Sequence, residues 1–142
     1  MAEATQPPVT AYLTVKGGFD AIKLYERAFD AELYTHKIAD DGERVLHAAL
    51  GVFGTMIMLS DEFPEYTSEL KAPTSIGTTT FTLHVGFDEP AQVDAAMRKA
   101  ETAGCKVVTP AMDAFWGMRY GHIRDPFGHA WAFGAPLPET KR

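Results

Sequence analysis

The sequence is short of several features that mark whole classes of proteins. Cys105 is its single cysteine, which excludes an internal disulfide. The longest weakly polar run, Ala48 to Leu59, is too short and too interrupted by glycine to span a bilayer. The N-terminus lacks the basic-then-apolar order of a signal peptide. These absences predict a cytoplasmic protein with no membrane partner.

Basic residues are in the minority. The chain carries 13 Lys and Arg residues against 19 Asp and Glu residues, a net charge of −6. A nucleic acid would have to bind a local patch against this unfavourable overall field, so we expect no nucleic-acid partner. Phosphate-cradling loops, nucleophile elbows and CxxC pairs are also missing from the sequence.

A strand-helix-strand-strand-strand pattern occurs twice in the 142 residues, of which 46% are hydrophobic. The first copy is predicted as strand 9–15, helix 19–29 and strands 32–38, 44–50 and 54–60. The second is predicted as strand 80–85, a helix capped by Asp88 and closed by Gly104, and strands 106–109, 116–124 and 129–133. The prediction is one α+β domain over 1–142, with modules at 9–60 and 79–134 and a connection at 61–78.

The last two strands are separated by a strong turn signal. Asp125-Pro126-Phe127-Gly128 has an Asp acceptor, a proline with fixed φ and a closing glycine, as in a type I turn. In the strand that follows, Trp131 and Phe133 alternate with Ala130 and Ala132. One face of this strand is therefore bulky and the other nearly bare.

The repeated pattern, the segment Ala21 to Phe29 and the closing Arg124 to Trp131 resemble the glyoxalase/bleomycin-resistance/extradiol-dioxygenase (vicinal oxygen chelate) superfamily. Phe115-Trp116-Gly117 with Arg119-Tyr120-Gly121 is similar to its PhnB-like branch. The resemblance implies two modules whose mixed sheets curl around a cup, with helices behind the sheets, and a homodimer. It also implies a family that includes lyases, transferases and dioxygenases.

The resemblance further implies a metal held at four positions that face the cup. Carried over by register, these positions are Thr10, Met58, Thr80 and Ala132. None of these residues supplies the imidazole or carboxylate that holds a catalytic divalent ion. The metal-dependent Lewis-acid chemistry of the superfamily is therefore not expected here. We therefore expect no metal and no other cofactor.

Strand alternation directs Tyr12, His47 and His84 toward the same cup. For His47 this requires Leu46 and its alternate neighbours to pack on a helix. The three side chains are candidate catalytic residues, because phenol and imidazole groups can transfer protons. Two other interpretations stay open, in which the histidines are substitute metal ligands or hydrogen-bonded polar groups of the wall.

A second group of candidates lies in the strand before the turn. Trp116 and Tyr120 beside Arg119 suit a planar or anionic small molecule, through stacking and charge-assisted hydrogen bonds. The alternative is a strand that anchors the rim of a dimer, with Arg119 paired to a carboxylate. If the first interpretation holds, Met58, Thr10 and Thr80 add to the ligand-binding wall.

Two functions follow from these patterns. The first is a metal-free cup that binds a small organic molecule, which the bare ligand positions favour. The alternative is a lyase-type or transferase-type enzyme of the same superfamily that uses His84, His47 and Tyr12, or a non-standard metal site. Fold alone cannot choose between a binding protein and an enzyme, so the sequence leaves catalysis open.

Overall fold

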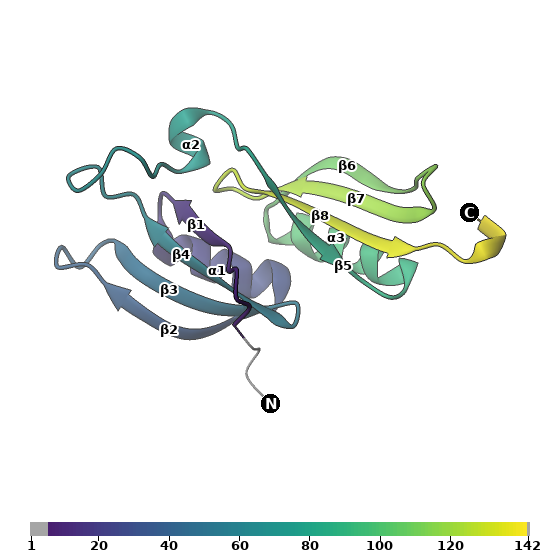
Figure 1. Cartoon of the computed structure of the whole chain (residues 1–142), viewed down its shortest axis with the longest axis horizontal. Helices are drawn as coiled ribbons and strands as arrows, with labels where there is room; N and C mark the ends of the chain where they lie inside the picture. Colours follow the sequence, from purple (N-terminus) through teal and green to yellow (C-terminus); the bar gives the residue numbers. More distant parts are fainter. Residues whose placement is uncertain (1–5, 142) are drawn as a thin grey trace. The chain divides into compact units, whose positions relative to one another are not determined.

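A computed structural model describes residues 6–141, so both ends of the predicted domain, 1–5 and 142, lie outside the described part. The chain divides between Thr78 and Thr79 into two compact units. Each unit contains the predicted β-α-β-β-β order, with a four-stranded mixed sheet (Figure 1). The predicted α+β class with two such modules is confirmed.

The first unit contains sheet A. Its elements are β1 (Tyr12–Val15), α1 (Gly18–Phe29), β2 (Glu32–Ile38), β3 (Val45–Val52), β4 (Thr55–Asp61) and the short α2 (Pro73–Ile76). The strand order is β1-β4-β3-β2, in which β1 runs parallel to β4 and the other pairs are antiparallel. The connection at 61–78 therefore belongs to this unit and contains a helix that was not predicted.

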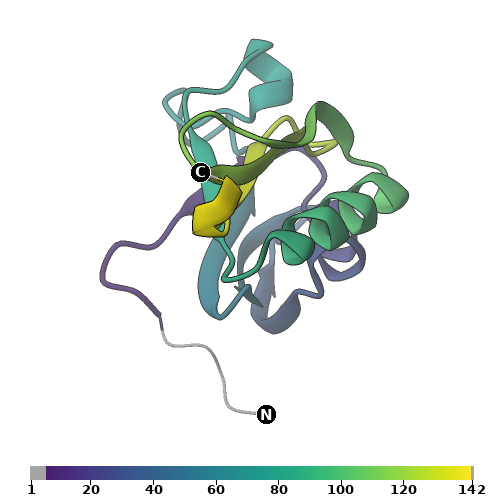
Figure 2. The same ribbon diagram turned by 90° about the vertical axis from the view of Figure 1, so that its right-hand side faces the viewer.

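The second unit contains sheet B. Its elements are β5 (Thr82–Gly86), α3 (Pro90–Ala103), β6 (Lys106–Asp113), β7 (Met118–Arg124), β8 (Ala130–Pro136) and the 3-10 turn η1 (Glu139–Lys141). The strand order is β5-β8-β7-β6, with β5 parallel to β8. Figure 2 shows α3 as a layer separate from the strands of its own unit.

Alternating side chains give each sheet a helix-facing side and an open face, by which we mean the face away from that unit's helix. In sheet A, Leu13, Val15, Ile57 and Leu59 are buried toward α1. In sheet B, Ile123, Trp131 and Phe133 are buried toward α3. Burial of these apolar side chains is the main force that fixes the strand register, because a one-residue slip would expose all of them.

The predicted turn before β8 is confirmed. Gly128 N donates to Asp125 O over 2.9 Å, and Gly128 has a φ of 88°. The Asp125 carboxylate accepts hydrogen bonds from the backbone N–H groups of Phe127 and His129 and, over 2.9 Å, from Trp131 Nε1. One buried carboxylate thus ties the turn to the largest side chain of the core.

Several predicted boundaries are wrong. The first strand begins at Tyr12, not at Val9. Val9 is exposed, and the Thr10 hydroxyl donates to Pro7 O over 2.8 Å. β5 likewise begins two residues after Thr80. β7 begins at Met118 because a turn closed by the Gly117 N to Ala114 O bond precedes it.

Two further predictions are corrected at the helices. Glu89, rather than Asp88, caps α3, and it forms a reciprocal capping box with Gln92. Leu46 does not pack on α1, since it is 39% exposed while Val45 is fully buried. β2 and β3 pair irregularly at this end, which explains why simple alternation fails there.

Candidate functional site

The open face of sheet A brings two predicted site residues into contact. Tyr12 pairs with Met58 across β1 and β4, and Met58 pairs with Ala49 on β3. His47 lies two residues before Ala49 on the same face, and its Nδ1 accepts a hydrogen bond from the Tyr12 hydroxyl over 2.7 Å when the imidazole proton is on Nε2. Burial raises the pKa of Tyr12, so the hydroxyl keeps its proton at neutral pH.

A cavity of about 330 Å³ opens beside this pair. Its lining consists of side chains from the sheet and from the connection after β4: Tyr12, Thr14, Ser60, Asp61, Phe63, Thr67 and Leu70. The volume falls within the range of small-molecule sites, and hydroxyl groups beside an aromatic wall are typical of such sites. All lining residues belong to the first unit.

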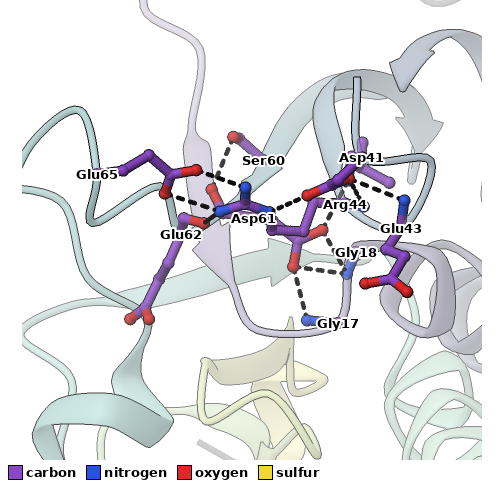
Figure 3. A network of polar contacts seen from close by, with 10 residues as sticks. Gly17, Gly18, Asp41, Glu43, Arg44, Ser60, Asp61, Glu62 and Glu65 are labelled. Atoms are coloured by element: carbon purple, nitrogen blue, oxygen red, sulfur yellow. Dashed lines mark hydrogen bonds and ion pairs between the residues drawn. The ribbon is translucent and has the colours of Figure 1, made fainter. Parts of the chain in front are cut away.

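Arg44 holds the connection in place over the sheet (Figure 3). Its guanidinium donates to Asp41 on the β2–β3 turn and to Glu65 in the connection, and the Nη1–Glu65 Oε1 distance is 2.9 Å. The guanidinium carbon also lies 4.3 Å from the centre of the Phe63 ring. This cation–π contact and the ion pairs fix Phe63 as a wall of the cavity.

Asp61 forms the base of the same region (Figure 3). Its buried carboxylate accepts hydrogen bonds from the backbone N–H groups of Gly17, Gly18 and Val45, at 2.7 Å for Gly17 and 2.8 Å for Val45. These bonds satisfy donors at the start of α1, where a negative charge also interacts favourably with the helix dipole. The end of β4, the start of α1 and β3 are therefore fixed by one side chain.

The open face of sheet B has a different arrangement. His84 pairs with Ala132, which in turn pairs with His122, so both imidazoles flank a small residue. Gly134 leaves room for His84, because a Cβ there would lie 2.9 Å from His84 Nε2. Pairing with Ala132 across β7 and β8 places His122 on this face, which alternation within β7 alone could not do.

His122 is the most unusual polar group on that face. Its Nε2 is buried and has no hydrogen-bond partner among the described residues. Burial first, and then the positive charge of Arg124, lower the pKa of this imidazole. The folded protein therefore favours neutral His122.

Trp116, Arg119 and Tyr120 do not form one surface. The rings of Trp116 and Tyr120 meet edge to face, with their centres 5.6 Å apart. Arg119, by contrast, points to the helix side of sheet B. There it pairs with Asp94 of α3 over 2.7 Å and with Asp113 of β6 over 3.1 Å. Of the two interpretations of Arg119, pairing with carboxylates is the one observed.

The residues at the four implied metal positions do not fit a divalent ion. Thr10 and Thr80 lie before their strands, and the residues opposite Met58 and Ala132 are Tyr12 and His84. Between residues 6 and 141, no three His, Cys, Asp or Glu side chains gather in a group that could hold a metal. That the purified protein carries no metal stays a prediction.

The comparison with protein families agrees with the fold. The profile of the Glyoxalase/Bleomycin resistance protein/Dioxygenase superfamily matches residues 8–133. The chain therefore belongs to this superfamily. None of the helices in the described part of the chain is long and apolar enough to cross a membrane.

Relatives and solved structures extend this finding. The chain is 39% identical to an uncharacterized protein of Mycobacterium tuberculosis over 99% of its own length and 81% of the relative's. It is similar to TioX from Micromonospora sp. ML1, with a TM-score of 0.70, 26% identity and coverage of 91% and 98% of the two chains. A PhnB protein from Bacillus cereus has a TM-score of 0.69 at 18% identity, with coverage of 93% and 100%, which shows a shared fold alone.

Proposed function

We propose that the protein binds a small organic molecule on the open face of sheet A, in the cavity beside Tyr12. The observation that carries this proposal is the cavity of about 330 Å³, which is lined by hydroxyl-bearing residues and by Phe63. Such a site can enclose a ring system and orient it by hydrogen bonds. Assignment to the PhnB-like branch belongs to the same proposal and rests on the motifs around Trp116 and Tyr120.

The test uses 2-naphthol, which is uncharged at pH 7, as a probe with one hydroxyl and one ring system. Ser60→Phe places a ring in the cavity, whereas Ser68→Phe makes the same change at an exposed position that does not line it. We expect saturable binding to the wild type and to Ser68→Phe, and loss of about tenfold or more in affinity for Ser60→Phe. Equal affinities of all three proteins, each with an unchanged melting temperature, would refute this site.

A second function is supported by one observation, the 2.7 Å contact between the Tyr12 hydroxyl and His47 Nδ1. The protonated phenol can donate its proton to a substrate, and solvent can return a proton to the phenolate through the neighbouring imidazole. The open face of sheet A would then belong to a lyase-type or transferase-type enzyme. Substrate would bind in the same cavity, with Tyr12 as the acid and His47 as its partner.

Tyr12→Phe separates these two functions, because it removes one hydroxyl and keeps the ring. For an enzyme, turnover of the substrate falls by about a hundredfold or more while naphthol binding changes little. For a binding protein, the naphthol affinity changes modestly and no substrate of the superfamily is turned over by either protein. His84→Gln on sheet B is the matched control, and it leaves any activity of the Tyr12 and His47 pair intact.

A further inference from the structure

We infer that the cavity on sheet A selects uncharged or positively charged aromatic compounds and rejects anions of the same shape. This inference rests on the proposed function and adds the charge class of the ligand. Its basis is the placement of charged groups around the cavity, and three observations carry it.

First, the lining has hydroxyl and apolar groups but no cation. None of the described residues that line the cavity is Lys or Arg, and one of them, Asp61, is acidic. The other polar lining residues are Tyr12, Thr14, Ser60 and Thr67, each of which carries a hydroxyl. A carboxylate or phosphate on the ligand would lose its hydration here without gaining an ion pair.

Second, the cation that contacts the Phe63 wall is already engaged. Arg44 donates to both oxygens of Glu65 and to Asp41, and its planar group lies over the Phe63 ring. The Arg44 hydrogen bond lowers the pKa of Glu65 to about 2, and backbone hydrogen bonds to Asp41 lower its pKa to about 2 as well. Both carboxylates stay ionised at neutral pH, so Arg44 is not free for an anionic ligand.

Third, the negative charge of the chain is concentrated in the unit that holds the cavity. Residues 1–78 include six Lys and Arg residues and twelve Asp and Glu residues, which accounts for the whole net charge of −6. Residues 79–142 include seven of each kind and are neutral overall. The field around the first unit therefore attracts cations and repels anions.

The test compares three probes of one shape: 2-naphthol, 2-naphthoate and 2-naphthylmethylammonium. We expect the naphthol and the ammonium to bind the wild type at least about fivefold more tightly than the naphthoate, the scale of one charge interaction near a protein surface. The difference in affinity between the ammonium and the naphthoate should shrink at high salt, because salt screens the electrostatic field of the protein. Naphthoate binding as tightly as naphthol, at a site blocked by Ser60→Phe, would overturn the inference and leave the proposed function standing.

A substitution at Leu70 tests whether the charge preference of the cavity can be reversed. It lies on the lining and is 64% exposed, so a polar residue there should be tolerated by the fold. Leu70→Lys should raise the naphthoate affinity about fivefold and lower the ammonium affinity. Leu70→Gln is the neutral control. It should leave the affinities for naphthoate and ammonium unchanged when each is expressed relative to the naphthol affinity. An unchanged ratio of naphthoate affinity to ammonium affinity in Leu70→Lys contradicts the inference. If no probe binds the wild type, the proposed function itself fails.

Discussion

Arg119 Nη2 donates to Asp94 Oδ1 over 2.7 Å, so one guanidinium joins β7 to α3. The Asp94 hydrogen bond raises the pKa of Arg119, and the Arg119 hydrogen bond lowers the pKa of Asp94, so both groups are charged at neutral pH. A residue whose sequence context suits anion binding is thus occupied within its own unit. Its role here is to support the packing of α3 on sheet B.

Arg119→Ala should therefore lower stability rather than ligand affinity. We expect the free energy of unfolding to fall by about 1 kcal/mol, from a partly exposed ion pair and the lost packing of the side-chain stem. The affinity for 2-naphthol should stay unchanged. Urea denaturation and a binding titration measure the two effects, with Arg98→Ala on α3 as the control. Weaker probe binding at unchanged stability would restore Arg119 to the ligand site.

Gly18→Ala should destabilise the first unit. A Cβ at Gly18 would lie 2.5 Å from Asp61 Oδ2 and 2.8 Å from Val45 Cβ, so the cap of α1 would have to move. Overpacking of this kind costs about 2 kcal/mol in the free energy of unfolding. Gly86→Ala is the matched control, because no atom lies within 4 Å of a Cβ there. Equal stability of the two variants in denaturant unfolding would show that Asp61 can be displaced at no cost.

His122 should make the protein less stable as the pH falls. Its pKa in the fold lies below the ordinary histidine value of 6.5, so the unfolded chain takes up the proton first. The free energy of unfolding contributed by neutral His122 is complete above pH 6.5 and is lost as the pH falls toward the folded pKa. His122→Gln should lose less stability than the wild type between pH 7.5 and pH 5. His36→Gln, at an exposed position of β2, is the control. Parallel pH curves for wild type and His122→Gln would contradict this account.

Cys105 should be unreactive in the folded protein. Burial, and then the negative charge of Asp125, raise the pKa of its thiol to about 12, so almost no thiolate exists at pH 8. A thiol reagent such as 5,5′-dithiobis-(2-nitrobenzoate) should react at least about a hundredfold faster after unfolding in guanidinium. Thr102→Cys in a Cys105→Ala background gives an exposed thiol on α3 as the reactive control. Fast labelling of the native wild type would show that this thiol is accessible.

The homodimer stays a prediction. Within the described residues, β2 and β6 end their sheets with backbone groups that no further strand of their own unit pairs, and exposed edges favour self-association. Light scattering at micromolar concentration should give the mass of two chains. The mass of one chain would count decisively against it.

Much of the fold could be read from side-chain alternation. Ile57 and Leu59 flank Met58 in β4, and both are buried on the helix-facing side, opposite Met58, as expected. Alternation failed at the ends of strands, which are set by backbone hydrogen-bond partners. Val9 fits the strand pattern, yet β1 starts only where Met58 N bonds to Ala11 O. The end of a strand depends on a partner far along the chain, which no local pattern contains.

The site was only partly predictable for the same reason. Alternation placed Tyr12 and His47 on one face, but the bond between them depends on the pairing of three strands. The cavity also needs Phe63, which is fixed by Arg44 across a long stretch of sequence. Local sequence could not choose between the two interpretations of Arg119, because its carboxylate partner Asp94 is 25 residues away. The packing of Met97 against Gly121, which identifies the helix side of β7, becomes visible only once α3 is placed.

The most direct test of the central claim is an amide ¹H–¹⁵N NMR titration of the full chain with 2-naphthol. We expect the largest shifts on the backbone amides of four residues that line the cavity, Thr14, Ser60, Phe63 and Thr67. Residues on the open face of sheet B, such as His84 and His122, should not shift. Large shifts confined to sheet B, or none at saturating probe, would contradict the assignment of the ligand site to sheet A.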